Sequence, residues 1–410
     1  MPQTLKPQDA GQVAEVLAWA AAEEKTMALV GGGSKAALGR PVTTDYRLDL
    51  SALNGVSLYE PEELVLRAAA ATPLGQIQAM LAQQRQQLAF EPPDFGDLYQ
   101  SMEQQTIGGV LATNLAGPRR IKAGAARDHF LGVQGISGRG TAFKSGGRVV
   151  KNVTGYDLCK LMAGSFGTLA ALTEVTVKVL PAPEKVRTVL LFGLDDAAAI
   201  VAMSQAAGSP YEVSGLAHLP SAIAAHSAVS YVGGAGAAVT AARLEGPAPS
   251  VAHRTAALRA QWGAVGAVEE LHGQNSAVLW REIANVASLL PDPHAVIWKL
   301  SVTPSLGAAA AAAALAMGGQ VYYDWAGGLL WLALRHQDRA QDDGGAALVR
   351  SALNEPDSGH ATLIRGPDAL RGRIDVFQPS APPLAALIGR IKDSFDPRRI
   401  LNPGRMYGDI

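Results

Sequence analysis

A short strand that runs directly into a glycine loop is the feature that most restricts how this chain can fold. Residues 26–30 are mostly apolar and predict a strand, and Gly31, Gly32, Gly33 and Ser34 follow at once. With Ala36 the loop satisfies the G-x-G-x-x-A pattern of Rossmann domains, and Asp49 lies about twenty residues further on, as that pattern asks. A Rossmann loop must open into a helix, however, and Gly39 and Pro41 interrupt any helix here.

The part of the nucleotide-binding pattern that still applies is the series of backbone amides at residues 31–34, which large side chains do not cover. Such amides can curl around a phosphate group without a helix behind them. A plain glycine turn between two strands would look the same, so the loop alone leaves both interpretations open. The chain contains no G-x-x-x-x-G-K-[ST] motif, which argues against a Walker-type nucleotide site.

Length, charge and cysteine content limit the possible cofactors and partners. The chain has 410 residues, enough for two or three domains, and its net charge of −1 gives no reason to expect nucleic acid as a partner. Cys159 is the only cysteine, so an internal disulfide is impossible and this chain alone cannot hold an iron–sulfur cluster. We predict no metal site.

No segment predicts secretion or a membrane span. The first residues lack a basic start followed by an apolar stretch, so no signal peptide is expected. Residues 308–317, mostly alanine, are about half as long as a bilayer span requires, and alanine is the best helix former. We therefore expect a packed helix there and a cytoplasmic protein.

Residues 1–183 are expected to form one domain with two subdomains, about 1–55 and 56–183. A capping-box pattern at Asp9 and Gln12 precedes a helix, and a second strand is expected at residues 46–50. Residues 58–180 mix strands and helices around glycine-rich turns, and the prolines at 181 and 183 mark a boundary. The apolar stripe of the first helix consists of Val13, Val16, Leu17 and Ala20.

Residues 184–375 predict a second, α+β domain. Its later half reads as strand 296–302, helix 305–317, a hairpin of 320–325 and 329–334, helix 346–353 and strand 361–365. That order is the ferredoxin-like β-α-β-β-α-β arrangement, and residues 186–271 follow it loosely. We expect two similar halves in one antiparallel sheet. A last segment, 376–410, returns to the first domain with a helix at 384–394.

Several ordered motifs resemble the FAD-binding family of vanillyl-alcohol oxidase and p-cresol methylhydroxylase, called PCMH-type. They are Thr106-Ile107-Gly108-Gly109, Ala112-Thr113-Asn114, Gly117-Pro118-Arg119, Lys151-Asn152 before Gly155-Tyr156-Asp157-Leu158, and Gly164-Ser165 before Gly167-Thr168-Leu169. The resemblance covers residues 1–183 and the ending Phe395-Asp396-Pro397 with Asn402-Pro403-Gly404. It implies a two-subdomain FAD-binding domain with the second, ferredoxin-like α+β domain as a cap.

The resemblance also implies which residues bind FAD. The glycine loop would hold the pyrophosphate, and the flavin and its ribityl chain would be lined by Thr106, Gly109, Thr113 and Gly117. Gly167 and Val175 would contact the cofactor further along, and Asn402 would come from the returning tail. For each residue a tight turn or a satisfied loop hydrogen bond is the alternative. The predicted cofactor-binding residues are Gly31, Gly32, Gly33, Ser34, Lys35, Leu38, Gly39, Pro92, Thr106, Gly108, Gly109, Ala112, Thr113, Gly117, Gly167, Val175 and Asn402.

We expect the FAD to be bound non-covalently. Some members of the family tether FAD through a histidine in the glycine loop, but Ser34-Lys35-Ala36 contains none. Cys159 follows Leu158 on an apolar helix face and is expected to be a buried small hydrophobe rather than a flavin link.

Within this family the chain resembles the smaller FAD-binding subunits of bacterial glycolate oxidases. The resemblance implies a complex that oxidises glycolate, a small hydroxy acid, to glyoxylate. A catalytic flavoprotein subunit would take the hydride, and an iron–sulfur subunit would pass the electrons on. Any association with a membrane would then come through these partner subunits.

The catalytic residues cannot be assigned from the sequence. The eight histidines are scattered, and the D-G-N-x-H motif expected of a catalytic partner is missing. Arg365, Arg371 and Arg373 could bind a carboxylate or could form a solvated basic face. Two alternatives stay open: a self-sufficient FAD-dependent oxidase or dehydrogenase of another hydroxy acid or alcohol, and a non-catalytic FAD-binding scaffold.

Overall fold

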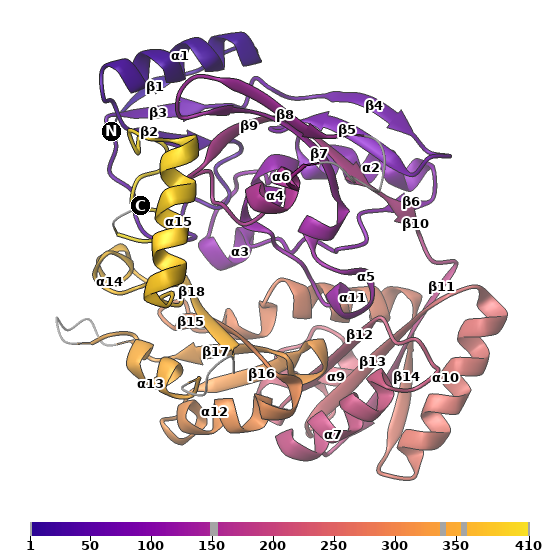
Figure 1. Cartoon of the computed structure of the whole chain (residues 1–410). Helices are drawn as coiled ribbons and strands as arrows, with labels where there is room; N and C mark the ends of the chain where they lie inside the picture. The colour runs from indigo at the N-terminus through magenta and orange to yellow at the C-terminus, as the bar shows by residue number, and fades with distance from the viewer. Residues whose placement is uncertain (1, 148–154, 337–341, 354–358, 409–410) are drawn as a thin grey trace.

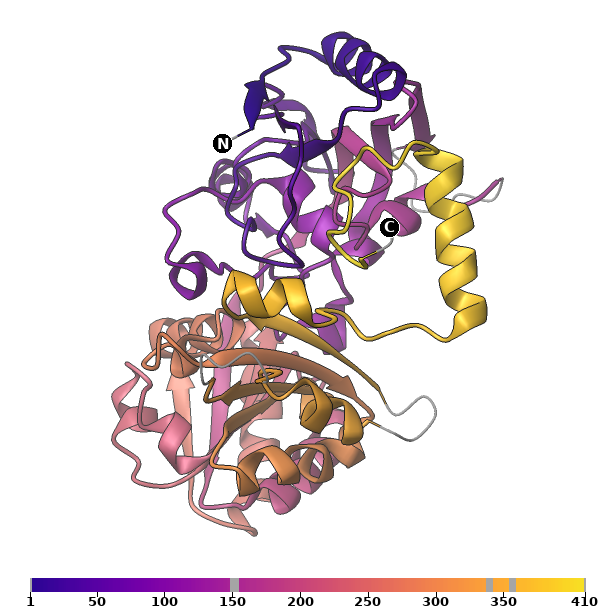
Figure 2. The same cartoon turned by 90° about the vertical axis from the view of Figure 1, so that its left-hand side faces the viewer.

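The chain folds into two lobes, one above the other in Figure 1. The computed structural model describes residues 2–147, 155–336, 342–353 and 359–408. The predicted motif at Lys151 and Asn152 lies outside these residues. The first lobe contains the strands up to residue 181, and the second lobe is built on one large sheet. The last segment of the chain leaves the second lobe and returns to the first (Figure 2).

A small parallel sheet with one helix begins the first lobe. Its strands lie in the order β1 (Gln3–Leu5), β3 (Tyr46–Asp49) and β2 (Met27–Val30). Helix α1 (Ala10–Ala22) starts at Asp9, whose carboxylate accepts a hydrogen bond from the Gln12 amide at 2.9 Å. Val13, Leu17 and Ala20 are buried, which confirms the predicted apolar stripe for three of its four positions. Val16 is half-buried.

A five-stranded antiparallel sheet completes the first lobe. Helices pack on it through one apolar core, to which Ile77, Val110 and Met162 contribute. The strands, in spatial order, are β4 (Val56–Glu60), β5 (Val65–Ala69), β9 (Ala170–Lys178), β7 (Phe130–Ser137) and β8 (Ala142–Gly146). The helices of this region are α2 (Leu74–Gln83), α3 (Gly96–Tyr99), α4 (Ile107–Thr113), α5 (Arg120–Ala123), η1 (Ala126–His129) and α6 (Leu158–Met162). A short pair, β6 (Gln86–Gln87) and β10 (Leu180–Pro181), lies next to the passage into the second lobe.

The second lobe has an eight-stranded antiparallel sheet made of two ferredoxin-like halves. The first half runs β11 (Lys185–Phe192), α7 (Asp196–Ala207), β12 (Gly215–Leu219), β13 (Val239–Gly246), α10 (Ala248–Gly263) and β14 (Val268–His272). The second half runs β15 (Val296–Val302), α12 (Gly307–Ala316), β16 (Gln320–Asp324), β17 (Leu329–Leu334), α13 (Ala346–Ser351) and β18 (Gly359–Arg365). The spatial order β14-β11-β13-β12-β16-β17-β15-β18 repeats one pattern in mirror order, and the halves join where His218 pairs with Tyr323. The predicted fold class is confirmed.

The two faces of this sheet have different neighbours. The outer face packs under α7, α10, α12 and α13, and the alanines 310, 311 and 314 of α12 are buried there, as expected of a packed helix. The inner face shares a core with the first lobe, to which Leu38, Phe95 and Leu115 contribute. Helix α11 (Gly273–Ala284) and the short helices α8 (Ser221–Ala224) and α9 (Ser230–Gly233) belong to the inner side. No helix within the described ranges is long and apolar enough to cross a membrane.

Ion pairs fasten the two lobes to each other. Glu91 of the first lobe accepts two hydrogen bonds from the buried Arg243 of β13, at 2.7 and 2.9 Å. Arg119 donates two hydrogen bonds to Glu245 of the same strand, at 3.0 and 2.9 Å. Both contacts are charge-assisted and bidentate, the geometry that gives such pairs their orientational specificity. These ion pairs therefore hold the two lobes in one relative orientation.

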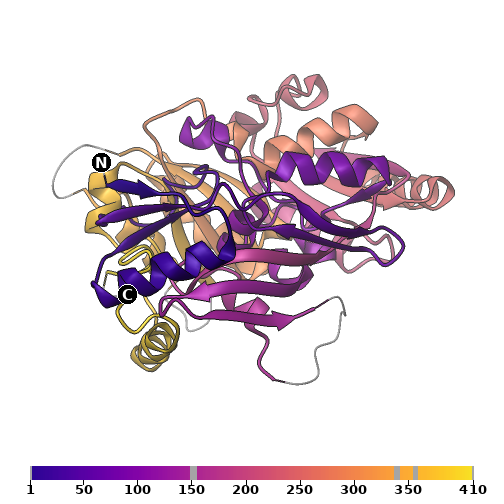
Figure 3. The same ribbon diagram turned by 90° about the horizontal axis from the view of Figure 1, so that it is seen from above.

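The returning tail is anchored by a fully buried ion pair. Helix α14 (Asp368–Arg373) is followed by α15 (Pro382–Phe395), near whose end Lys392 donates to Asp396 at 2.7 Å; both side chains have 0% exposure. Lys392 Nζ also donates to the Thr168 and Leu401 carbonyls, at 2.7 and 3.0 Å. The Asp396 carboxylate accepts from the amides of Ile400 and Leu401. The pair thus fixes the tail beside the glycine loop, and the chain ends lie on one side of the molecule (Figure 3).

Replacing Asp396 by alanine should destabilise the first lobe by about 3–5 kcal/mol, because it leaves the Lys392 charge buried without a counter-ion. Urea denaturation followed by circular dichroism would measure the change. Asp393→Ala is the matched control: Asp393 is half exposed and pairs with Arg399 on the same surface, so a change below about 1 kcal/mol is expected. Equal destabilisation by the two substitutions would contradict the anchoring role of the buried pair.

Candidate functional site

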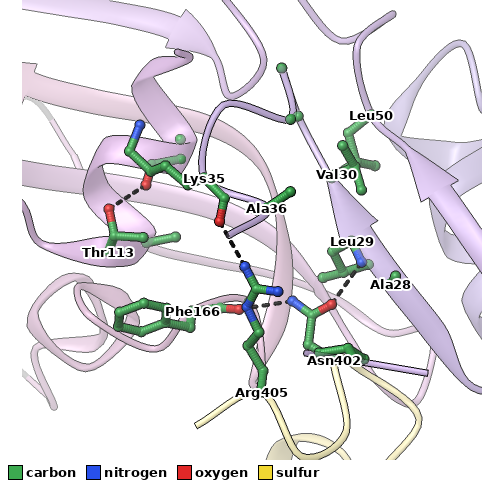
Figure 4. A pocket seen from close by; sticks show the side chains of 18 of the residues that line it. Ala28, Leu29, Val30, Lys35, Ala36, Leu50, Thr113, Phe166, Asn402 and Arg405 are labelled. Carbon is green, nitrogen blue, oxygen red and sulfur yellow. Dashed lines mark hydrogen bonds between the residues drawn. The ribbon is translucent and has the colours of Figure 1, made fainter. Parts of the chain in front are cut away.

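A pocket of about 430 Å³ opens in the first lobe at the end of β2. The glycine loop, α4, the turn at Phe166 and Gly167, α14 and the tail all contribute to its walls (Figure 4). The structure brings twelve of the seventeen predicted cofactor-binding residues together in this lining. They are Gly31, Gly32, Gly33, Ser34, Lys35, Thr106, Gly108, Gly109, Ala112, Thr113, Gly167 and Asn402.

Five predicted residues lie outside the lining. Leu38 and Val175 are buried in apolar cores, Leu38 between the lobes and Val175 in the five-stranded sheet. The Gly39 carbonyl accepts a hydrogen bond from Arg371 at 2.6 Å. Gly117 lies against Glu91 at the lobe boundary, where its carbonyl accepts from the Trp325 indole at 3.1 Å. Pro92 is half-buried and follows Glu91.

The glycine loop is packed too tightly for side chains at two positions. A Cβ on Gly32 would lie 1.8 Å from the Gln104 carbonyl oxygen, and a Cβ on Gly31 would lie 2.9 Å from Thr106 Oγ1. Gly33 has φ +86°, a backbone conformation that favours glycine. Within the described residues, no acceptor receives a hydrogen bond from the backbone amides of residues 31–35. These amides are therefore available to bind an anion, as a phosphate-binding nest requires.

Helix α4 forms a second wall because its start is pressed against the sheet. Thr106 caps the helix and accepts from the Gly109 amide at 3.3 Å. A Cβ on Gly108 would meet the Ala70 carbonyl oxygen at 2.7 Å, so only glycine lets the helix approach β5 this closely. Thr113 donates to the Gly109 carbonyl at 2.7 Å, which leaves its methyl group at the pocket wall.

The tail closes the pocket through two side chains from the end of the chain. Asn402 accepts from the Leu29 amide and donates to the Phe166 carbonyl, each at 2.8 Å. Arg405 donates to the Lys35 carbonyl at 2.7 Å (Figure 4). Asn402 was expected from the resemblance, whereas Phe166 and Arg405 were missed. The position of Arg405, three residues after Asn402, was the only sequence signal for it.

The three arginines singled out from the sequence all donate hydrogen bonds to backbone carbonyls. Arg371 is buried, lines the pocket and donates to the Gly39 and Gly366 carbonyls. Arg365 donates to the Ala295 carbonyl at 3.0 Å, and Arg373 donates to the Asp342 carbonyl. A solvated basic face is excluded for the buried Arg371 alone, because Arg373 is exposed and Arg365 is half-buried.

The pocket has a positive lining. Burial lowers the pKa of Lys35 to about 8, although Asp94 partly opposes the shift. Burial and the neighbouring Arg371 lower the pKa of Arg405 to about 10. Such shifts mean that these cations have fewer compensating anions than their burial requires. Unused amides and undercompensated cations in one pocket fit the pyrophosphate of a dinucleotide cofactor.

The other reactive side chains do not form a second centre. No histidine lines the pocket, and the described part of the chain holds no group of three or more His, Cys, Asp or Glu side chains that could bind a metal. Cys159 is buried, and burial raises the pKa of its thiol to about 12. The thiol is therefore protonated and unreactive at neutral pH, which confirms the expected buried hydrophobe.

Comparison with known proteins identifies the cofactor. Residues 2–146 match the family model described as an FAD binding domain. Over 95% of its length the chain is 32% identical to glycolate oxidase subunit GlcE of Escherichia coli (strain K12), of which it covers 95%. A stretch of 111 residues, 27% of this chain and 23% of the relative, is 42% identical to glycolate oxidase subunit GlcD of Bacillus subtilis (strain 168).

Solved structures share the two-lobe fold. p-Cresol methylhydroxylase with substrate bound has a TM-score of 0.71 at 15% identity, over 99% of this chain and 88% of that one. 4-Ethylphenol oxidase from Gulosibacter chungangensis also reaches 0.71, at 12% identity over 99% and 89% of the two chains. Fold and pocket together define a PCMH-type flavoprotein that uses FAD. The chain belongs to the FAD-dependent oxidoreductase family that includes glycolate oxidase subunit GlcE.

Gly32→Ala should weaken FAD binding roughly ten-fold or more, because the new Cβ must displace the backbone at Gln104 and distort the loop. Gly75→Ala in helix α2 is the matched control, since its Cβ would meet nothing within 4 Å. Fluorescence titration of the apoprotein with FAD would measure both dissociation constants. Unchanged affinity in Gly32→Ala would show that this loop does not hold the cofactor.

FAD affinity should fall as pH rises through about 8, because the pyrophosphate binds the protonated form of Lys35 and that form is lost above its pKa. Titrations between about pH 7 and pH 9 would show the decline. Lys35→Gln should bind FAD more weakly without this pH dependence, and Lys35→Arg should keep the affinity at high pH. The same pH profile in all three proteins would exclude Lys35 as the titrating group.

Proposed function

We propose that this chain is the FAD-binding subunit of a complex that oxidises glycolate to glyoxylate and passes the electrons on through partner subunits. The observation that carries the proposal is the match to GlcE along nearly the whole of both chains. The shorter match to GlcD supports it, because that relative is another subunit of a glycolate oxidase by name. The pocket supplies what an FAD-binding subunit needs: a phosphate nest, cations and a closing tail.

The residues of this chain bind and orient the cofactor. Bound FAD supplies a ring system that accepts two electrons as a hydride from an alcohol carbon. The loop amides and Lys35 would hold the pyrophosphate, and Asn402 fixes the turn at Phe166 against the pocket. Arg405 of the tail donates to the Lys35 carbonyl and so holds the tail against the glycine loop.

A partner is proposed for proton abstraction and for onward electron transfer. The acid–base groups of the described lining are Lys35, Arg47, Asp368, Arg371 and Arg405, and the Asp368 carboxylate is paired with Arg371. The arginines stay protonated, Asp368 is paired, and Lys35 is assigned to the pyrophosphate, so we propose none of them as the general base for a hydroxyl group. The single cysteine cannot hold an iron–sulfur cluster. We therefore assign these steps to a catalytic flavoprotein subunit and an iron–sulfur subunit of a cytoplasmic complex, with any membrane contact made through them.

Anaerobic addition of glycolate to the assembled complex should bleach the absorbance of the FAD on this chain, while the purified chain alone should turn over glycolate slowly with an artificial acceptor. Rapid turnover by the purified chain would contradict the division of labour and favour a self-sufficient enzyme. In that case, stopped-flow reoxidation by oxygen would separate an oxidase from a dehydrogenase. If the complex turned over while this FAD stayed oxidised, the chain would be a scaffold.

A further inference from the structure

Basic side chains from both lobes converge on one tryptophan at the lobe boundary. The Arg120 guanidinium of α5 lies 4.4 Å from the centre of the Trp325 ring. The Lys299 ammonium of β15 lies 5.3 Å from the centre of the same ring. Both distances are within the range of a cation–π contact, which stabilises a cation but does not neutralise its charge. The cluster therefore places two cationic side chains at one indole.

The sheet register adds a third basic group on the same side. Lys299 pairs with Thr362 of β18, and His360 precedes Thr362 by two positions. Residues two apart on a strand point to one face, so Lys299 and His360 belong to the inner face, beside the first lobe. Burial lowers the pKa of His360, and Lys299 and Arg120 lower it further. These three groups are thus close enough to repel one another.

The cluster lacks a matching anion. Within the described residues, neither Arg120 nor Lys299 forms an ion pair with a carboxylate. Asp324 of β16 lies on the same face of the sheet, but burial raises its pKa to about 7, so it is only partly ionised at neutral pH. Its carboxylate already accepts from the Trp325 amide at 2.7 Å. Burial and Arg120 lower the pKa of Lys299 to about 8, as expected of an undercompensated cation.

The cluster can be reached from solvent and lies next to the cofactor-binding segment. Arg120 and His360 are exposed and Lys299 is partly exposed. The Trp325 indole donates to the Gly117 carbonyl at 3.1 Å, at the lobe boundary and outside the pocket lining. A short segment, 114–119, connects α4 at the pocket wall with α5. A small anion could therefore bind here beside the cofactor.

We propose that Arg120, Lys299 and His360 form a binding site for a small carboxylate next to Trp325. Arg120 and Lys299 would each donate charge-assisted hydrogen bonds to the carboxylate oxygens. The choice of a 2-hydroxy acid or its 2-oxo product as the natural ligand rests on the proposed function. The site would give this subunit its own contact with the acid, in addition to the site of the catalytic partner.

Isothermal titration calorimetry of the FAD-loaded chain with oxalate, a carboxylate that cannot be oxidised by hydride loss, tests the proposal. The wild-type chain should bind oxalate, and Arg120→Gln and Lys299→Gln should each weaken binding by about ten-fold or more. Arg390→Gln, which removes an exposed arginine of α15, is the matched control and should leave the affinity unchanged. Circular dichroism and the flavin spectrum confirm that each variant is folded and loaded.

Wild-type affinity in both Arg120→Gln and Lys299→Gln would overturn the site, as would the absence of oxalate binding to the wild-type chain. Sulfate binding as tight as that of oxalate would overturn the assignment to a carboxylate. Glycolate oxidation by the assembled complex is measured separately. If the wild-type chain binds oxalate and the variants do not, but the assembled complex fails to oxidise glycolate, the site is kept and the proposed function is rejected. If the complex oxidises glycolate but this chain does not bind oxalate, the proposed function is kept and the site is rejected.

Discussion

The cofactor pocket depends on the buried ion pair between Lys392 and Asp396. Each charge is removed from water, so each needs the other and the backbone groups around it. These contacts fix the tail against β2 and bring Asn402 to the Leu29 amide across 373 positions of sequence. A wall of the pocket is thus built by residues that no local sequence pattern connects. Without the anchor, the glycine loop would lose the side chains that close it.

The charged residues at the boundary between the lobes have two different roles. Glu91 and Glu245 compensate Arg243 and Arg119, and these contacts hold the lobes together. Arg120, the neighbour of Arg119, has no such partner within the described residues and faces Trp325 instead. Two adjacent arginines therefore have different roles: one neutralised and structural, the other charged and exposed. Arg119 holds the lobes together, whereas Arg120 remains available to bind an anion.

Much of the fold could be predicted from the sequence. Apolar periodicity and glycine turns located the strands at residues 296–302 and 329–334 and the alanine-rich helix between them, because local patterns determine local structure. Helix α11 was missed although its buried positions 276, 279, 280, 283 and 284 follow helical spacing, because it lies outside the repeated ferredoxin-like order. The glycine loop was found because consecutive glycines directly after an apolar strand are a local sequence signal.

The rest of the site needed tertiary information. Arg371 and Arg405 reach the pocket only because the last part of the chain folds back onto the first lobe, which no spacing in the sequence shows. Phe166 lies next to the predicted Gly167 and was missed although it belongs to the first lobe. The resemblance also suggested residues that are not in the lining: Leu38 and Val175 have apolar side chains that pack into cores. The cation cluster at Trp325 likewise combines α5 with β15 and β18, which are distant in sequence. The parts of a site that come from one segment could be predicted from the sequence, and the parts formed by distant segments could not.

The pocket is expected to hold FAD without a covalent link. An absorbance spectrum of the purified chain, taken before and after acid precipitation, tests this. We expect a yellow protein whose flavin bands move wholly into the supernatant. A colourless protein that also fails to bind added FAD would contradict it.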